Sequence, residues 1–136
     1  CWVAKYVCRR HTAASLHRVL SDVLGPSAIN MLYHPRDAKK NASASFAFIN
    51  FASVAEAHRA VRLLHGRMWR RPDGTVDTNP RAIVLEPARV QGIAECLSTL
   101  KGDWHHQSLI IFHEGRCIDK EAALRLYCSL CVVAIV

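Results

Sequence analysis

The amino-acid sequence predicts an α+β protein with the ferredoxin-like βαββαβ order of strands and helices. Three segments, at 1–7, 29–33 and 45–51, carry apolar residues that alternate or cluster as they do in β-strands. Helix-like segments follow the first and the third of these, and a short strand at 82–85 completes the order. In this arrangement one face of the sheet packs on both helices, while the other face stays open unless additional chain covers it.

The two helices are expected where apolar residues recur at helical spacing between start and stop signals. Thr12 is a suitable N-cap for the first helix, which the Gly-Pro pair at 25–26 ends. Ser53 and Glu56 form a capping box at the start of the second helix, and Gly66 closes that helix.

The length of 136 residues leaves room for one domain with a modest extension. We expect the ferredoxin-like unit at 1–92, an extension at 93–114 and a helical or apolar tail at 115–136. Within the last two segments the pattern predicts a helix at 91–100, a short strand at 109–112 and a helix at 120–131. The first residue is Cys1 rather than Met, so we expect the sequence to be part of a longer protein.

The charge balance favours a polyanionic partner. Lys and Arg number 18 against 11 Asp and Glu, which gives a formal net charge of +7. Cationic side chains that contact phosphates displace condensed counterions, so a basic surface attracts nucleic acid. The 6 cysteines show no framework spacing and no secretory signal is present, which favours reduced thiols and an intracellular location, nuclear or cytoplasmic.

The strand at 45–51 carries the chemistry of greatest interest. Together with Ala44 it can be laid on the octamer of RNA recognition motifs, K/R-G-F/Y-G/A-F-V-x-F/Y. Strand alternation directs Phe46, Phe48 and Asn50 to the open face and the residues between them to the helices. RNA bases stack on such exposed rings. The same rings would be ordinary core residues if both faces of the sheet were covered.

Six spaced segments also carry a family resemblance. They are KYVCRRHT at 5–12 beside RNIPNKYT, LYHPRD at 32–37 beside LYLPID, SFAFINF at 45–51 beside GYAFVNF, HGRMW at 65–69 beside HGQRW, ARVQG at 88–92 beside an identical ARVQG, and SLIIFH at 108–113 beside PILFH. On these landmarks the chain, over about residues 1–114, resembles the C-terminal RNA recognition motif of the Mei-two-like proteins, which regulate meiosis and development. The resemblance implies RNA binding and a lid-like C-terminal extension.

Three positions depart from the motifs of such RNA-binding domains. Ala44 stands where the octamer has a phosphate-binding cation, and Ser45 replaces its glycine. Val3 occupies the second position of the first-strand hexamer, which is often aromatic in this fold. These departures affect the predicted function more than the predicted fold.

We expect the RNA-binding surface to combine outward strand residues with basic residues of the flanking loops. Lys5 is expected to point outward beside Phe48, and the pattern leaves the face of Tyr33 open. Further arginines, Arg70, Arg71 and Arg81, flank a long loop or hairpin predicted at 67–81. The predicted site residues are Phe46, Phe48, Asn50, Lys5, Val3, Tyr33, Arg9, Arg10, Arg36, Lys39, Lys40 and Arg89.

Two functions follow from this surface. The first is binding of single-stranded RNA in post-transcriptional, meiotic or developmental regulation. The alternative is a protein-interaction module of the same fold, in which the extension or the tail covers the sheet and RNA does not bind. Exposure of the Phe46 and Phe48 rings discriminates between the two.

Other classes of function find little support. No nucleophile, metal or phosphate-loop motif is present, so we predict no enzyme, no cofactor and no small-molecule substrate. Cys128 and Cys131 have the Cys-x-x-Cys spacing, but no second cysteine pair accompanies them, so no metal is predicted. The apolar run at 128–136 is shorter than the roughly 20 residues that span a bilayer, so no membrane partner is expected.

Overall fold

The computed structural model describes residues 1–37, 42–43, 45–77, 81–89, 109–113, 116–118 and 120–123. The predicted helix at 91–100, the end of the last predicted helix, and Lys39, Lys40, Ala44, Cys128 and Cys131 lie outside these residues. The elements are β1 (Trp2–Lys5), α1 (Ala13–Leu24), β2 (Ile29–Tyr33), β3 (Arg36–Asp37), β4 (Ala42–Ser43), β5 (Phe46–Phe51), α2 (Val54–Leu64), β6 (Val84–Pro87), β7 (Leu109–His113), β8 (Arg116–Ile118) and α4 (Lys120–Ala123).

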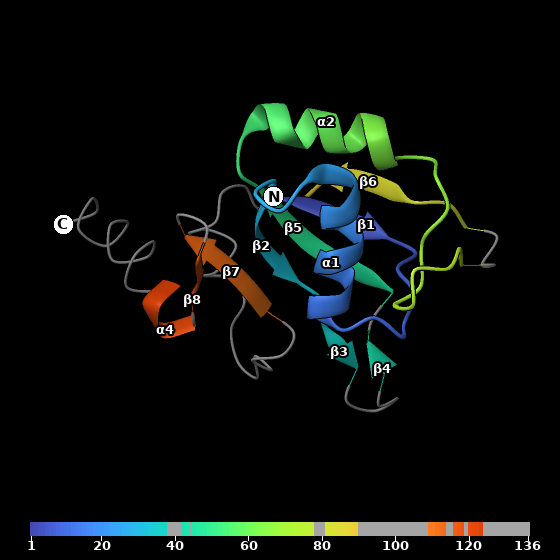
Figure 1. The fold of residues 1–136 in the computed structure, drawn as a ribbon, viewed down its shortest axis with the longest axis horizontal. Helices are drawn as coiled ribbons and strands as arrows, with labels where there is room; N and C mark the ends of the chain where they lie inside the picture. Colours follow the sequence, from blue (N-terminus) through green and yellow to red (C-terminus); the bar gives the residue numbers. More distant parts are fainter. Residues whose placement is uncertain are drawn as a thin grey trace.

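Six strands form one antiparallel sheet in the order β6-β1-β5-β2-β7-β8. Its four strands β1, β2, β5 and β6, with α1 and α2 between them, reproduce the predicted βαββαβ order. Figure 1 shows α1 and α2 in front of the sheet, with β7, β8 and α4 beyond its β2 edge. The ribbon β3-β4 projects from the connection between β2 and β5. The predicted ferredoxin-like fold is therefore confirmed.

The predicted helix caps are present. The Thr12 hydroxyl accepts a hydrogen bond from the Ser15 amide, and the Ser15 hydroxyl accepts one from the Thr12 amide. Gly25 follows α1 with φ 96°, a left-handed value that favours glycine. At α2 the Ser53 hydroxyl accepts from the Glu56 amide, whereas the Glu56 carboxylate pairs with Arg59, so the predicted capping box forms only in part. These bonds satisfy amides that the first helical turns leave without partners.

The main core lies between the sheet and the two helices. The inward residues of β5, among them Ala47 and Ile49, are fully buried there against Leu16 and Leu20 of α1. Trp69, from the loop after α2, is also buried, and its indole N–H donates to the Lys5 carbonyl at 3.0 Å. This bond fastens the loop beneath the end of β1, because the buried indole donor needs a partner.

The bounds of β1 and β6 differ from the prediction, and β6 also ends at Pro87 rather than at residue 85. β1 stops at Lys5 rather than at residue 7, because Tyr6 has φ 64° and turns the chain out of the extended conformation. β6 begins at Val84 rather than at residue 82, because the backbone of Ile83 pairs with the loop instead. The Ile83 amide donates to the Arg67 carbonyl, and the Ile83 carbonyl accepts from the Gly66 amide.

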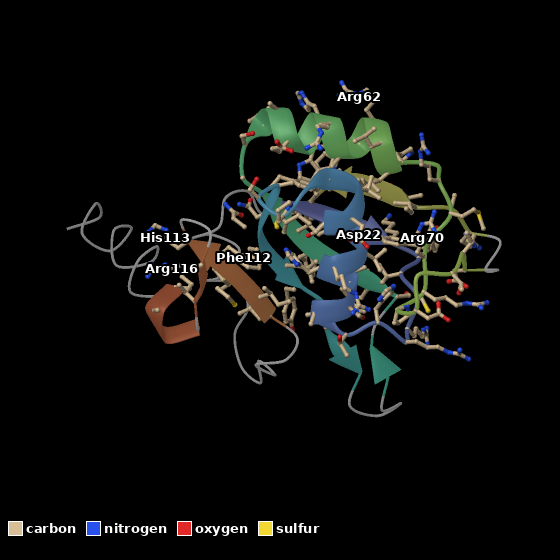
Figure 2. The ribbon with its side chains drawn as sticks, viewed as in Figure 1. Asp22, Arg62, Arg70, Phe112, His113 and Arg116 are labelled. Carbon is tan, nitrogen blue, oxygen red and sulfur yellow. The ribbon has the colours of Figure 1, made fainter. Side chains whose placement is uncertain are left out.

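The strand predicted at 109–112 is present as β7. The sequence did not predict which strand β7 pairs with. β7 pairs with β2 in antiparallel register, Met31 with Ile111 and Tyr33 with Leu109. On the helix side, the Phe112 ring stacks on His17 of α1 with centroids 4.8 Å apart (Figure 2). Among the described residues no helix is both long and apolar enough to cross a membrane.

Candidate nucleic-acid interface

The sheet face opposite α1 and α2, which we call the outer face, carries the predicted site residues of β5. Phe46 is 39% exposed and Phe48 and Asn50 are half-buried, whereas the alternating Ala47 and Ile49 are fully buried. The predicted alternation along β5 is thus confirmed. Phe46 leaves a large part of an apolar ring in water.

Three aromatic rings form a continuous group on this face. The Phe46 and Phe48 centroids lie 5.7 Å apart in an edge-to-face contact. Tyr33 of β2 is paired with Phe48, and their rings are stacked with centroids 6.3 Å apart. The face of Tyr33, which the sequence left open, is therefore the outer face. Burial raises the pKa of the Tyr33 phenol, so it stays a neutral hydrogen-bonding group.

Lys5 points outward as predicted, but its predicted neighbour is wrong. The register of β1 on β5 places Lys5 opposite Phe46 and Val3 opposite Phe48. Register depends on both strands together, so the sequence of one strand does not fix it. The Lys5 ammonium lies 2.8 Å from a Glu86 carboxylate oxygen, and this hydrogen bond raises the pKa of Lys5. Glu86, which the sequence analysis missed, thus places an acidic group on the outer face.

Asn50 is held by a neighbouring side chain. Its amide N–H donates to the side-chain oxygen of Asn30 at 2.8 Å. Asn30 lies where the β2-β5 register shifts, between Ile29 and Met31. A bulge of this kind redirects a side chain, here toward the neighbouring strand.

One part of the outer face is closed by a second apolar cluster, formed by buried Cys1, Met31, Ile111 and Ala123. We call this part the Met31 half. Ala123 belongs to α4, which follows β8 and packs against β7. The Phe46 half, formed by Val3, Lys5, Tyr33 and Phe46, lies at the other end of the same strands. Phe48 packs against the Met31 half and touches both neighbouring rings, so it lies at the boundary.

The structure gathers some of the predicted arginines and separates another. Arg9, Arg10 and Arg81, all exposed, line one hollow of about 480 Å³ at the Phe46 end of the sheet. Arg89 is exposed at the opposite end, because β6 runs antiparallel to β1 and pairs Pro87 with Trp2. It does not join the other arginines.

The arginines of the long loop are held within a small hairpin, bridged between Arg70 and Val76. The Arg70 guanidinium donates to the Gly74 carbonyl, and Arg71 lies 3.8 Å from Asp77 (Arg70 is labelled in Figure 2). Arg36 is in β3, close in sequence to Tyr33.

Tyr6 is a site residue that the sequence analysis missed. The Arg81 guanidinium carbon lies 4.9 Å from the centre of the Tyr6 ring, and Arg81 donates a hydrogen bond to the Tyr6 hydroxyl at 3.2 Å. A second hollow, of about 260 Å³, is lined by Val3, Lys5, Tyr6, Ser45 and Phe46. An aromatic residue followed closely by two arginines at the end of the first strand was the signal available in the sequence.

The described residues contain no group of three His, Cys, Asp or Glu side chains that could hold a metal ion. Comparison with models of known protein families finds no match, and comparison with curated proteins finds none.

Three solved structures are similar to the chain. The second RRM domain of the yeast poly(U)-binding protein Pub1 has a TM-score of 0.47 and 15% identity, over 67% of this chain and 96% of that one. The RNA-binding protein PG1 has a TM-score of 0.49 and 15% identity, over 67% and 95%. The Sxl-lethal protein in an RNA complex has a TM-score of 0.49 and 22% identity, over 68% and 48%.

Similarities at these TM-scores give no further evidence about the fold, because the topology alone defines it. The strand order β6-β1-β5-β2 with both helices on one face is the ferredoxin-like arrangement.

Proposed function

We propose that this protein binds single-stranded RNA through the Phe46 half of its outer face. The observation that carries the proposal is the 39% exposed Phe46 ring, in contact with Phe48 and so continuous with Tyr33. A base stacked on such a ring removes its apolar surface from water and is typically worth about 1–3 kcal/mol. Stacking accepts every base, so it provides affinity with little sequence preference.

Basic side chains beside the rings support the same proposal. Arg9, Arg10 and Arg81 lie at the Phe46 end, where they can meet the phosphates of a strand stacked on the rings. We propose that Arg36, Lys39 and Lys40, between β2 and β5, extend this positive surface. Lys5 contributes less, because a phosphate would compete with Glu86 for its ammonium group.

The remaining predicted residues have supporting roles in this proposal. Val3 provides an apolar floor next to Phe48, and Asn50, ordered by Asn30, offers its carbonyl oxygen to a base edge. Arg89 lies too far along the strands to share a stacked base with Phe46, so its role is limited to long-range attraction.

The test is a fluorescence-anisotropy titration of a labelled random-sequence RNA with the full chain, at several salt concentrations. A Phe46→Ala/Phe48→Ala variant should bind more weakly by at least about 1–3 kcal/mol, and binding of the unmodified chain should weaken with salt. The matched control is Val54→Ala, which removes a 72% exposed apolar side chain from α2 and should leave binding unchanged.

Salt-sensitive binding that the double variant leaves intact would show charge attraction without stacking, and the proposed site would be wrong. No binding at low salt by the folded chain would contradict RNA binding altogether.

A protein-interaction module is the second candidate, favoured by one specific observation. The Met31 half is closed, with Met31 and Ala123 fully shielded from solvent in one apolar cluster. If further chain covered Phe46 as well, the outer face would have no stacking surface. Phe46 exposure favours RNA over this candidate.

Finer assignments rest on the sequence motifs. The ARVQG segment at 88–92 and the SFAFINF strand at 45–51 support membership of the Mei-two-like family, with a role in post-transcriptional or developmental regulation inside the cell. The proposed unit is an RNA recognition motif at 1–92 with its extension at 93–114 and a tail at 115–136.

A further inference from the structure

We propose that the RNA strand leaves the sheet past the end of β1, where Tyr6 and Arg81 form a nucleotide subsite outside the strands. This inference rests on the proposed RNA binding and adds the position of one nucleotide to it. A base would lie in the hollow between Phe46 and Tyr6, and its phosphate in the adjoining hollow lined by arginines.

The base position follows from the smaller hollow. Its lining includes Phe46, Tyr6 and Val3, in about 260 Å³. The left-handed backbone of Tyr6, with φ 64°, turns the chain out of the run of β1, and Tyr6 lines this hollow while it also packs against the main core. The Val7 amide donates to the Ser45 carbonyl at 2.8 Å, which holds the chain after Tyr6 against the start of β5. The site is therefore built on fixed backbone and not on a loose loop.

The phosphate position follows from the larger hollow. It shares Tyr6 and Ser45 with the smaller one, so the two are adjacent, and it adds Arg9, Arg10 and Arg81. One acid also lines it, Asp77, whose carboxylate lies 3.8 Å from Arg71. Three arginines against one partly compensated carboxylate leave a positive hollow that suits a phosphate.

Arg81 is placed to serve both hollows. Its guanidinium lies over the Tyr6 ring at 4.9 Å and bonds the Tyr6 hydroxyl at 3.2 Å. A guanidinium plane held in this way can stack on a base and still direct N–H groups to a phosphate. The order already present means that less side-chain entropy is lost on binding.

The opposite direction along the strands is blocked. Beyond Phe48, Met31 and Ile111 are buried and offer no surface for a further base. A strand stacked on Phe46 therefore continues toward Tyr6 rather than toward Met31.

The experiment compares two arginine variants of the full chain in the same RNA titration. Arg81→Gln and Arg62→Gln each remove one positive charge from an exposed side chain, but Arg62 lies on α2, away from the outer face. We expect Arg81→Gln to weaken binding about fivefold or more and to reduce the steepness of log affinity against log salt by about 0.7, the value for one phosphate of a single strand. Arg62→Gln should change affinity by less than about twofold.

Ultraviolet crosslinking of the same labelled RNA, read by mass spectrometry, locates the base independently of any substitution. We expect a crosslinked peptide that contains Tyr6. Equal losses in the two arginine variants, or crosslinks confined to Met31 and β7, would overturn the subsite while leaving RNA binding at Phe46 in place. If the unmodified chain binds no RNA, the proposed function fails and the subsite fails with it. Arg10→Gln, in the same hollow, replaces Arg81→Gln if that variant does not fold.

Discussion

The two halves of the outer face are built from the same strands and differ in almost every other respect. β2 contributes Met31 to one half and Tyr33 to the other, only two residues apart. Met31 is completely buried in an apolar cluster, whereas at the other end Phe46 keeps 39% of its surface in water beside exposed arginines. The Met31 half therefore contributes to stability, and the Phe46 half is available to a ligand.

The cause of the difference lies outside the four strands of the motif. β7 and β8 extend the sheet beyond β2, and Ala123 of α4 joins Met31 and Ile111 in one buried apolar cluster. An added segment of this kind covers part of a binding face and leaves the rest open. The open part then determines where a strand of RNA can lie.

The largest expected effect concerns stability. Met31→Ala should lower the free energy of unfolding by about 2–5 kcal/mol, since it empties a fully buried site. Phe46→Ala should cost much less, because its ring is already partly in water. Denaturant unfolding of both variants measures the contrast. A Phe46→Ala variant as destabilised as Met31→Ala would mean that Phe46 is a core residue and that the outer face is closed in solution.

The second prediction concerns how the stability of the folded chain depends on pH. His11 is buried after β1, where its Nε2–H donates to the Arg70 carbonyl at 2.7 Å, and burial lowers its pKa below the ordinary 6.5. Burial also lowers the pKa of His17. The unfolded chain therefore takes up protons first as the pH falls. Stability is full above the ordinary value of 6.5 and is lost as the pH falls through the lowered pKa.

Thermal unfolding between about pH 7.5 and pH 5 measures this effect, and the midpoint should fall with pH. His11→Gln should reduce the dependence, whereas His58→Gln, at an exposed position of α2, should leave it as it is. Identical pH profiles for the unmodified chain and His11→Gln would show that the folded chain does not bury His11 in its neutral form.

The smallest expected effect concerns the acid within the Phe46 half. Glu86→Gln removes a negative charge and leaves the Lys5 ammonium available to a phosphate, so RNA affinity should rise about two- to fivefold. Glu56→Gln is the matched control, because it breaks a comparable ion pair with Arg59 on α2, away from the outer face. Both are measured in the RNA titration at low salt. Equal gains in RNA affinity in the two variants would mean that the effect arises from the change in net charge alone.

The sequence predicted what depends on local pattern. Alternation along 45–51 assigned Phe46 and Phe48 to the outer face, and Thr12 and Ser53 marked the helix starts, because caps and strand faces depend on neighbours in sequence. The order of these elements was enough to predict the fold.

What the sequence could not predict depends on pairs of distant residues. Lys5 was assigned to Phe48 instead of Phe46, because register is a property of β1 and β5 together. The contact of Glu86 with Lys5 and that of Arg81 with Tyr6 join residues about 80 positions apart in each case. Met31 likewise shares its buried cluster with Ile111 and Ala123, which are distant from it in sequence.

The most direct test of RNA binding at the Phe46 half is a residue-resolved NMR titration of the full chain with an unlabelled random-sequence RNA. We expect amide shifts to change at Tyr6, Arg9, Phe46 and Phe48, and the Met31 amide to change little, since that half is already covered. Changes centred on Met31, or changes spread evenly over the sheet, would contradict binding at the Phe46 half.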